Sequence, residues 1–160
     1  QFQTQNVAEA RIYGVEVSAE YRFSPGLDGF SVLGSLAFAE GDNTTDDEPL
    51  STVDPLTAVL GLRYRAPEDR WRAELLSTLV GQARVEDGAD TFVPDAYALF
   101  DLIGSYNPTP NLGLSLGIYN LFNTEYYVYS DVRNQPEDAP DIQRFSQPGT
   151  NFRVGVSYRF

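Results

Sequence analysis

Residues 151–160 read Asn-Phe-Arg-Val-Gly-Val-Ser-Tyr-Arg-Phe, with apolar and polar side chains in strict alternation. Successive side chains of a β-strand point to opposite faces, so this stretch predicts a strand with one charged face and one apolar face. The apolar row is Phe152, Val154, Val156, Tyr158 and Phe160. A strand of about 9–11 residues with one such face is the unit from which a membrane-spanning β-barrel is built.

The same alternation recurs through the rest of the chain. Six earlier strands are expected near residues 13–23, 30–39, 56–65, 71–76, 98–106 and 112–118. Short turns with Pro, Gly or Asn are expected at 24–29, 66–69 and 107–111, and long acidic loops at 41–54, 82–94 and 129–148. Short turns alternate strictly with long loops, so the sequence predicts an all-β fold, an antiparallel transmembrane β-barrel section of about seven strands.

Aromatic residues on the apolar face lie at a common depth beside the short turns. They are Tyr21, Phe23, Phe30, Tyr64, Trp71, Tyr106, Tyr158 and Phe160. Such a belt is typical of side chains at a membrane–water interface. A lipocalin, which is also an up-and-down barrel, would show the alternation without placing aromatic residues at one depth.

Composition excludes several classes of function. The formal net charge of −12 argues against a nucleic-acid partner. The chain contains neither cysteine nor histidine, which removes disulfides, thiolate metal sites and the commonest general base. No catalytic, cofactor-binding or metal site is therefore expected, and the run Asp46-Asp47-Glu48 lacks the spacing of an EF-hand loop. We expect that the chain is not an enzyme.

Charged residues on the polar face are expected to pair inside the barrel. Glu16 and Glu20 share a face with Arg22 and Arg63, so ion pairs between these groups are a simpler interpretation than an acid–base site. Asp101 is flanked by apolar residues, and a carboxylate facing lipid would be costly. We therefore expect Asp101 to face the lumen and to be hydrogen-bonded there.

An odd number of strands raises the question of closure. Open sheet edges in a bilayer leave backbone groups without partners, and single-chain bacterial barrels usually have an even number of strands. The first residue is Gln1, and no signal peptide precedes the first strand. We expect residues 1–160 to be the carboxy-terminal part of a longer barrel. The alternative is a small OmpA- or OmpX-like structural or adhesive barrel, which needs only one more strand.

Three segments resemble motifs of the TonB-dependent outer-membrane receptors. Residues 10–16 (Ala-Arg-Ile-Tyr-Gly-Val-Glu) resemble a late barrel strand of that family, residues 119–127 (Tyr-Asn-Leu-Phe-Asn-Thr-Glu-Tyr-Tyr) its penultimate-strand motif, and residues 147–153 the start of its final strand, with Thr150 in place of the usual arginine. The resemblance implies a barrel of about 22 strands filled by an amino-terminal plug, which is not in this sequence. It also implies a place in the bacterial outer membrane, with the carboxy-terminus in the periplasm and the long acidic loops outside.

The resemblance further implies partners and a ligand. The partners are outer-membrane lipid and lipopolysaccharide, the TonB system through the missing amino-terminal region, and the barrel assembly machinery, which recognises an aromatic carboxy-terminal strand such as the row that ends in Phe160. Residues 130–134 and 144–149 are most similar to the haem/haemoglobin-type subgroup. The ligand would be haem or a haem protein, otherwise a siderophore, and it would be transported rather than held as a cofactor. Candidate ligand-facing residues lie in loops 41–54, 83–95 and 128–148, with Tyr129, Arg133 and Arg144 foremost.

Overall fold

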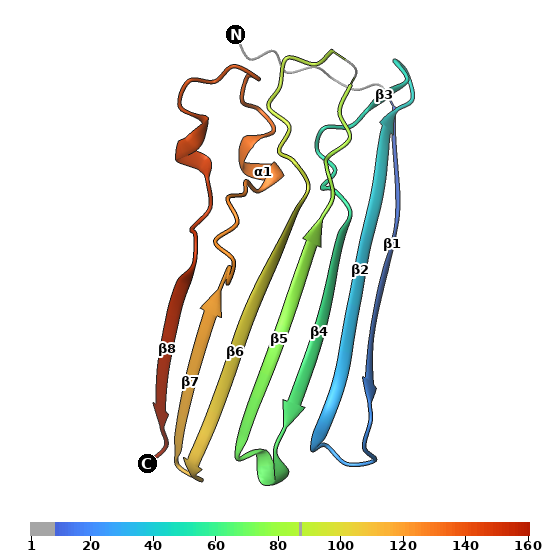
Figure 1. Ribbon diagram of the computed structural model, residues 1–160. Helices are drawn as coiled ribbons and strands as arrows, with labels where there is room; N and C mark the ends of the chain where they lie inside the picture. Colours follow the sequence, from blue (N-terminus) through green and yellow to red (C-terminus); the bar gives the residue numbers. More distant parts are fainter. Residues whose placement is uncertain (1–8, 87) are drawn as a thin grey trace.

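The computed structural model describes residues 9–86 and 88–160, which form one antiparallel β-sheet (Figure 1). Its strands are β1 (Ala10–Arg22), β2 (Gly29–Asn43), β3 (Glu48–Pro49), β4 (Thr57–Arg65), β5 (Trp71–Val80), β6 (Tyr97–Thr109), β7 (Leu112–Tyr119) and β8 (Asn151–Tyr158). The order across the sheet is β1-β2-β4-β5-β6-β7-β8, and β3 pairs only with β2. Each long strand thus lies beside its neighbour in sequence, which confirms the predicted all-β, antiparallel fold.

Short turns and long loops lie at opposite ends of the sheet, and the carboxy-terminus lies at the end with the short turns (Figure 1). The helical segments are short and belong to the connections: η1 (Pro67–Asp69), α1 (Tyr129–Val132) and η2 (Ile142–Phe145). Among the described residues, no helix has the length and apolar character needed to cross a membrane. The β-sheet is therefore the main structural element of the described residues.

The loop expected at residues 41–54 begins later than the sequence suggested. β2 continues to Asn43 because the chain folds back to form β3, and the Leu50 amide donates a hydrogen bond of 2.8 Å to the Gly41 carbonyl. The acidic composition of this stretch hid the extension, because Asp, Asn and Gly are uncommon in strands.

Three other boundaries were also wrong by a few residues. β1 begins at Ala10 instead of Tyr13, and β5 continues regularly to Val80, where the alternation had blurred. β6 extends to Thr109, so the turn expected at 107–111 is tighter, and the β6–β7 register shifts between Tyr106 and Thr109. The register shift accommodates the prolines of this turn, because proline has no backbone N–H for the hydrogen bonds between strands.

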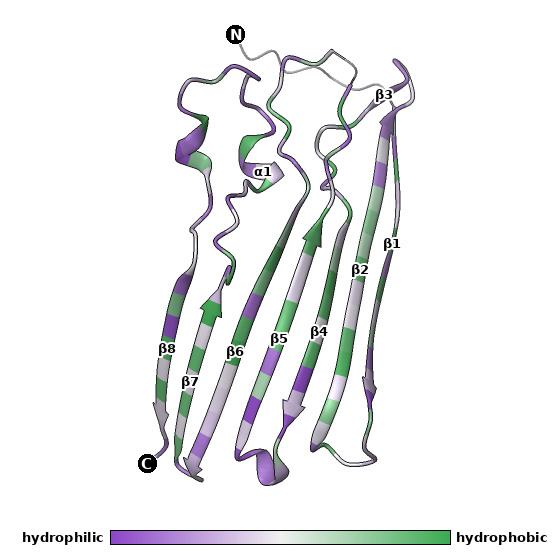
Figure 2. Cartoon of the chain, in the orientation of Figure 1, coloured by the Kyte–Doolittle hydropathy of each residue, from purple (hydrophilic) through white to green (hydrophobic). Residues whose placement is uncertain are grey.

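Hydrophobic and hydrophilic residues alternate along the strands (Figure 2), so the two faces of the sheet differ in polarity. The apolar face exposes large side chains along every long strand, from Val15 in β1 to Val156 in β8, whereas the buried apolar residues in the described part of the chain are few. They are Ala66, Tyr129 and Val132. A soluble monomer rarely exposes an apolar surface of this extent.

The aromatic residues beside the short turns form a belt that is interrupted at β7, where Leu114 is paired with Tyr106 and Leu112 with Tyr158. Phe30 packs against Tyr64 with ring centroids 4.8 Å apart, and Tyr64 packs against Trp71 at 4.7 Å. Trp71 is paired in register with Tyr106 on the next strand. Edge-to-face pairs extend the belt at both ends of the sheet: Tyr21–Phe23 and Tyr158–Phe160, each at 5.2 Å. The common depth predicted from the sequence is therefore confirmed.

Charged groups on the polar face pair only in part as expected. Arg63 lies between Glu74, with Nε and Oε2 2.6 Å apart, and Glu20, with Nη1 and Oε1 3.4 Å apart. Glu16 takes part in no ion pair among the described residues. Asp101 accepts a hydrogen bond of 2.8 Å from the Asn120 backbone amide, so its carboxylate is bound by the sheet itself.

Candidate functional site

The three long loops meet at one end of the sheet around helix α1. The Phe92 amide donates a hydrogen bond of 2.8 Å to the Gln135 carbonyl, and the Thr91 hydroxyl donates one of 2.8 Å to the Arg133 carbonyl. Arg133 Nη1 in turn donates to the Thr52 carbonyl at 3.4 Å. Loops 41–54, 83–95 and 128–148, separate in the sequence, are thereby joined into one surface.

Tyr129 lies inside this loop cluster and not on its surface. Its side chain is 4% exposed, and that of Val132 one turn on is fully buried. The hydroxyl is buried without a hydrogen-bond partner in the described structure. Burial is the main cause that raises the pKa of Tyr129, while Arg133 lowers it and Asp54 raises it. In this arrangement Tyr129 is a packing residue, and its ring reaches an incoming ligand only if the loops separate.

Arg133 and Arg144 occupy different environments. Arg133 follows α1, where its amide bonds to the Tyr129 carbonyl, so these two candidates lie together. Arg144 lies in η2, with Nη1 2.6 Å from Asp141 Oδ2 and the guanidinium 4.9 Å above the Phe145 ring. Its side chain is 64% exposed, the most open of the three candidates. Arg144 is consequently the candidate best placed to meet a ligand from solution.

Asn120 ties the penultimate strand to the start of the last one. It lies directly after β7, is 3% exposed and has a positive φ of 51°. Its side-chain amide donates to the Thr124 carbonyl at 2.7 Å and the Pro148 carbonyl at 3.3 Å, and its side-chain oxygen accepts from the Thr124 amide at 2.8 Å. Asparagine suits this position because it tolerates positive φ and carries both a donor and an acceptor.

Thr150 completes this hydrogen-bonded clasp from the other side. Its hydroxyl donates to the Asn120 carbonyl at 2.7 Å, and its amide donates to the side-chain oxygen of Asn123 at 3.1 Å. A Cβ at Gly149 would collide with that same oxygen, which explains the glycine. The two motifs that the sequence presented separately, at 119–127 and 147–153, are therefore partners, which sequence reasoning missed.

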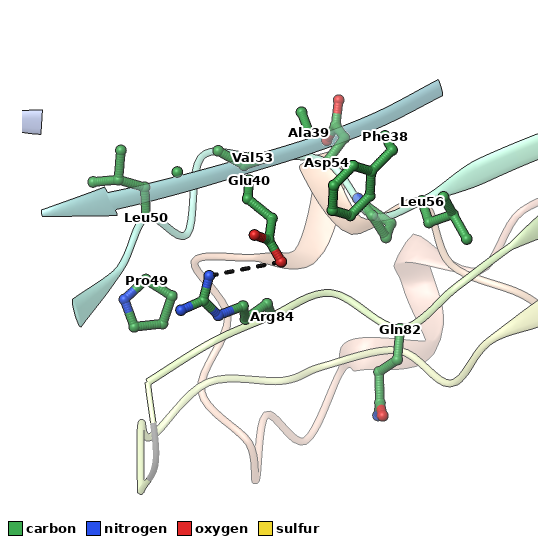
Figure 3. A pocket seen from close by; sticks show the side chains of 12 residues that line it. Phe38, Ala39, Glu40, Pro49, Leu50, Val53, Asp54, Leu56, Gln82 and Arg84 are labelled. Atoms are coloured by element: carbon green, nitrogen blue, oxygen red, sulfur yellow. Dashed lines mark ion pairs between the residues drawn. The ribbon is translucent and has the colours of Figure 1, made fainter. Parts of the chain in front are cut away.

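A cavity of about 180 Å³ lies where β2 and the chain leading into β4 separate (Figure 3). Its walls include Phe38, Leu50 and Val53, and Arg84 reaches across it toward β2. Arg84 lies 4.0 Å from Glu40 and 3.0 Å from Asp42, measured between side-chain nitrogen and oxygen atoms. These pairs attach the loop after β5 to the outer end of β2. Sequence reasoning did not single out Arg84.

A second pocket, of about 280 Å³, lies on the polar face near the long loops. Tyr119, Tyr126, Asp101 and Arg153 line it, and the Arg153 guanidinium lies 4.9 Å above the Tyr119 ring. Burial is the main cause that raises the pKa of Tyr126, and the nearby Asp101 charge adds to it. The phenol of Tyr126 thus remains a neutral donor and acceptor at physiological pH.

Among the described residues, no group of three or more Asp and Glu side chains is placed to hold a metal ion. The acidic run in the β2–β3 hairpin forms part of the turn. Asp46 accepts a hydrogen bond of 2.7 Å from Asn43, and Asp47 has a positive φ of 60°. All five side chains of the carboxy-terminal apolar row are exposed: Phe152, Val154, Val156, Tyr158 and Phe160.

Comparisons of the sequence with a family model and with known proteins give consistent results. Residues 1–121 match the family model described as TonB dependent receptor-like, beta-barrel. A hemoglobin and hemoglobin-haptoglobin-binding protein of Haemophilus ducreyi is 27% identical over 99% of this chain. A hemoglobin-haptoglobin utilization protein B of Neisseria meningitidis is 26% identical, also over 99%. The chain spans only 20% and 23% of these two relatives, respectively.

Solved structures with the same arrangement of strands include one described as a transporter and one described as a receptor. The copper transporter OprC is 31% identical, with a TM-score of 0.78 over 94% of this chain and 24% of its own. The ferric enterobactin receptor PfeA of Pseudomonas aeruginosa has a TM-score of 0.73 over 97% of this chain and 23% of its own, at 21% identity. The second likeness concerns the fold alone.

Proposed function

Since this chain belongs to the family of TonB-dependent receptor β-barrels, we propose that it forms the carboxy-terminal part of an outer-membrane receptor that imports an iron-containing ligand. Haem or a haem protein is the first ligand candidate. The supporting observation is that the haemoglobin-binding relatives align over 99% of the chain, loops included. The complete barrel would have about 22 strands around an amino-terminal plug, and the TonB system would act through that region.

The arrangement of the connections supports an orientation. The long acidic loops would lie outside the cell and the short turns in the periplasm, since outer-membrane barrels distribute their connections in this way (Figure 1). The loop cluster around α1 would then be the capture surface, with Arg144 open to solvent. The exposed aromatic belt would contact lipid and lipopolysaccharide at the membrane interface.

Siderophore import is the second candidate, because the fold that this chain shares with a ferric enterobactin receptor does not by itself distinguish between iron-containing ligands. Copper binding by residues 1–160 is disfavoured, because this chain contains no histidine, cysteine or methionine, the side chains that bind copper most readily. The small OmpA- or OmpX-like barrel remains the alternative from another class of protein.

A growth assay in the native bacterium tests the proposal. A strain that lacks the gene for the polypeptide containing this chain is complemented with the intact gene or with one that lacks the codons for residues 128–148. We expect the intact gene to restore growth on haemoglobin as the iron source and the loop deletion to abolish it, because that loop builds the capture surface. Growth on a ferric siderophore alone would instead establish the second candidate.

The control is a deletion of residues 26–28 in the short β1–β2 turn, which lies at the opposite end of the sheet. It should leave haemoglobin-dependent growth intact. The mass of the native polypeptide provides an independent check. A mass several-fold above 17.8 kDa is expected, and one close to that value would overturn the transporter in favour of the small barrel.

Deletion of Phe160 tests the proposed assembly role of the last strand. Phe160 is fully exposed and packs edge-to-face on Tyr158, so its removal shortens the apolar row without disturbing a buried contact. We expect less folded barrel in the outer membrane, measured by heat-modifiable mobility on a gel. Phe122→Ala, which removes another exposed aromatic residue, one that lies outside the carboxy-terminal apolar row, is the control, and equal amounts of folded barrel for both variants would refute the assembly role.

A further inference from the structure

The pocket of about 280 Å³ on the polar face contains an arginine without a carboxylate partner. Arg153, in β8, makes no ion pair with any residue that the structure describes. Asp101, in β6, lines the same pocket but is engaged elsewhere, because it accepts the backbone amide of Asn120 at 2.8 Å. The guanidinium of Arg153 therefore remains available to an anion that enters the pocket.

The neighbouring strand β7 orients this guanidinium. Gly117 is paired in register with Arg153, and a Cβ on Gly117 would lie 2.5 Å from a carbon of the Tyr119 ring. Because glycine has no Cβ, the Tyr119 ring can lie over this position. The Arg153 guanidinium lies 4.9 Å from the centre of that ring, a contact that is attractive for a cation. A guanidinium stacked on an aromatic ring keeps its donors at the edge, so Arg153 is held in place without losing them.

Hydroxyl and amide groups surround the same space. Tyr126, Gln147 and Asn151 line the pocket together with Arg153. The Tyr126 ring is packed against Tyr97, with ring centroids 4.8 Å apart. The Asn151 side chain donates one hydrogen bond, to the Gly149 carbonyl at 3.1 Å, and its amide has a second N–H. Such donors around a guanidinium suit a carboxylate, which is an acceptor at both of its oxygens.

We propose that this pocket binds a carboxylate of the transported ligand. The inference rests on the proposed function, and with haem as the ligand the bound group is one of its two carboxylates. The pocket is smaller than the about 300–1,000 Å³ typical of sites that enclose a whole ligand, so it admits a carboxylate arm and leaves the ring outside. Gln147 and Pro148 in its lining end the loop that builds the capture surface, so a ligand arriving there is next to the pocket.

Asp101 makes the charge of the occupant measurable. Its carboxylate lines the pocket without pairing with Arg153, so it opposes a bound anion by repulsion between like charges. Asparagine at this position keeps an oxygen that accepts the Asn120 amide and removes only the negative charge. Asp101→Asn should therefore strengthen the binding of a carboxylate, whereas Arg153→Gln should weaken it.

Absorbance titration of the purified, full-length receptor with haem and with haem dimethyl ester, in which both carboxylates are esterified, tests the proposal. Arg153→Gln should weaken haem binding roughly tenfold, because charge-assisted hydrogen bonds are lost. Asp101→Asn should strengthen haem binding about threefold, because a like charge is removed. Neither substitution should change the affinity for the ester, which has no carboxylate to bind.

Two further variants complete the experiment. Arg159→Gln is the matched control, since it removes the same charge directly after the last strand, where the Arg159 amide bonds to Asn111 in a short turn, and it should change neither affinity. Arg153→Lys keeps the charge and loses the planar fork. It should weaken haem binding by an intermediate factor, and it replaces Arg153→Gln if that variant does not fold.

Three results would overturn the inference. Equal haem affinities for the wild type and both Arg153 variants would mean that no carboxylate occupies the pocket. Equal losses of affinity for haem and for the ester would make Arg153 a structural residue. Weaker haem binding by Asp101→Asn would mean that the occupant is not an anion. In each of these cases haem binding by the wild type would leave the proposed function standing, whereas a wild type that binds neither compound would overturn both.

Discussion

Replacing Leu60 with arginine is expected to destabilise the folded barrel by about 2–4 kcal/mol, the cost of a cation at the middle of a lipid-facing strand. Leu60 lies at the centre of β4, is paired with Gly34 and Ser77, and is 54% exposed on the apolar face. No acidic side chain lies in its cross-strand row on either neighbouring strand. Unfolding in urea from lipid bilayers, followed by tryptophan fluorescence of Trp71, measures the change.

Ser35→Arg is the matched control for this substitution. Ser35 is paired with Val59, the residue before Leu60, so it lies at nearly the same depth and on the polar face. The same side chain at this position should cost much less, because it meets the polar interior and not lipid. If Leu60→Arg and Ser35→Arg unfold at the same urea concentration, the two faces of the sheet have been assigned in reverse.

Asn120→Ala is expected to cost about 2–4 kcal/mol and to loosen the loop between β7 and β8. The substitution removes three side-chain hydrogen bonds, each worth about 0.5–1.5 kcal/mol, and leaves the amide of Thr124 without its acceptor in a partly buried site. Alanine also tolerates the φ of 51° less well than asparagine. The urea midpoint and the rate of proteolysis within residues 120–150 report the two effects.

Two further variants separate the causes of this loss of stability. Asn123→Gly keeps a residue that accepts the positive φ of 53° and removes only the acceptor for the Thr150 amide, so a smaller loss is expected. Asn134→Ala changes an exposed asparagine of the same loop and should have no effect. Equal proteolysis of Asn120→Ala and Asn134→Ala would show that the clasp does not hold the loop.

Much of the fold follows from local patterns. The alternation in β8 and the six earlier strands identified correctly which side chains share a face, because successive side chains of a strand point to opposite sides of the sheet. The depth of the aromatic belt was also readable, since Phe30, Tyr64 and Trp71 stand next to recognisable turns. Strand ends were less accurate, and the extension of β2 to Asn43 was missed because its last residues are acidic.

The candidate site was less accessible to prediction. The loops were located correctly, but Tyr129 was chosen as a ligand-facing residue, while the structure buries it beneath loops that come from distant parts of the chain. Nothing in the local sequence around Tyr129 indicates that Thr91 and Thr52 lie near α1. Contacts of Arg84 with Glu40 and Asp42 were missed for the same reason.

The sequence by itself determined which side chains share a face, the order of turns and loops, and the membership of the chain in its family. Only the tertiary structure decided which residues are neighbours across strands and loops. The physical reason is that sliding one strand by two residues preserves every face and changes every cross-strand pair. The register therefore had to be seen before Arg153 was found opposite Gly117, and before Asn120 was found bound to the start of the final strand.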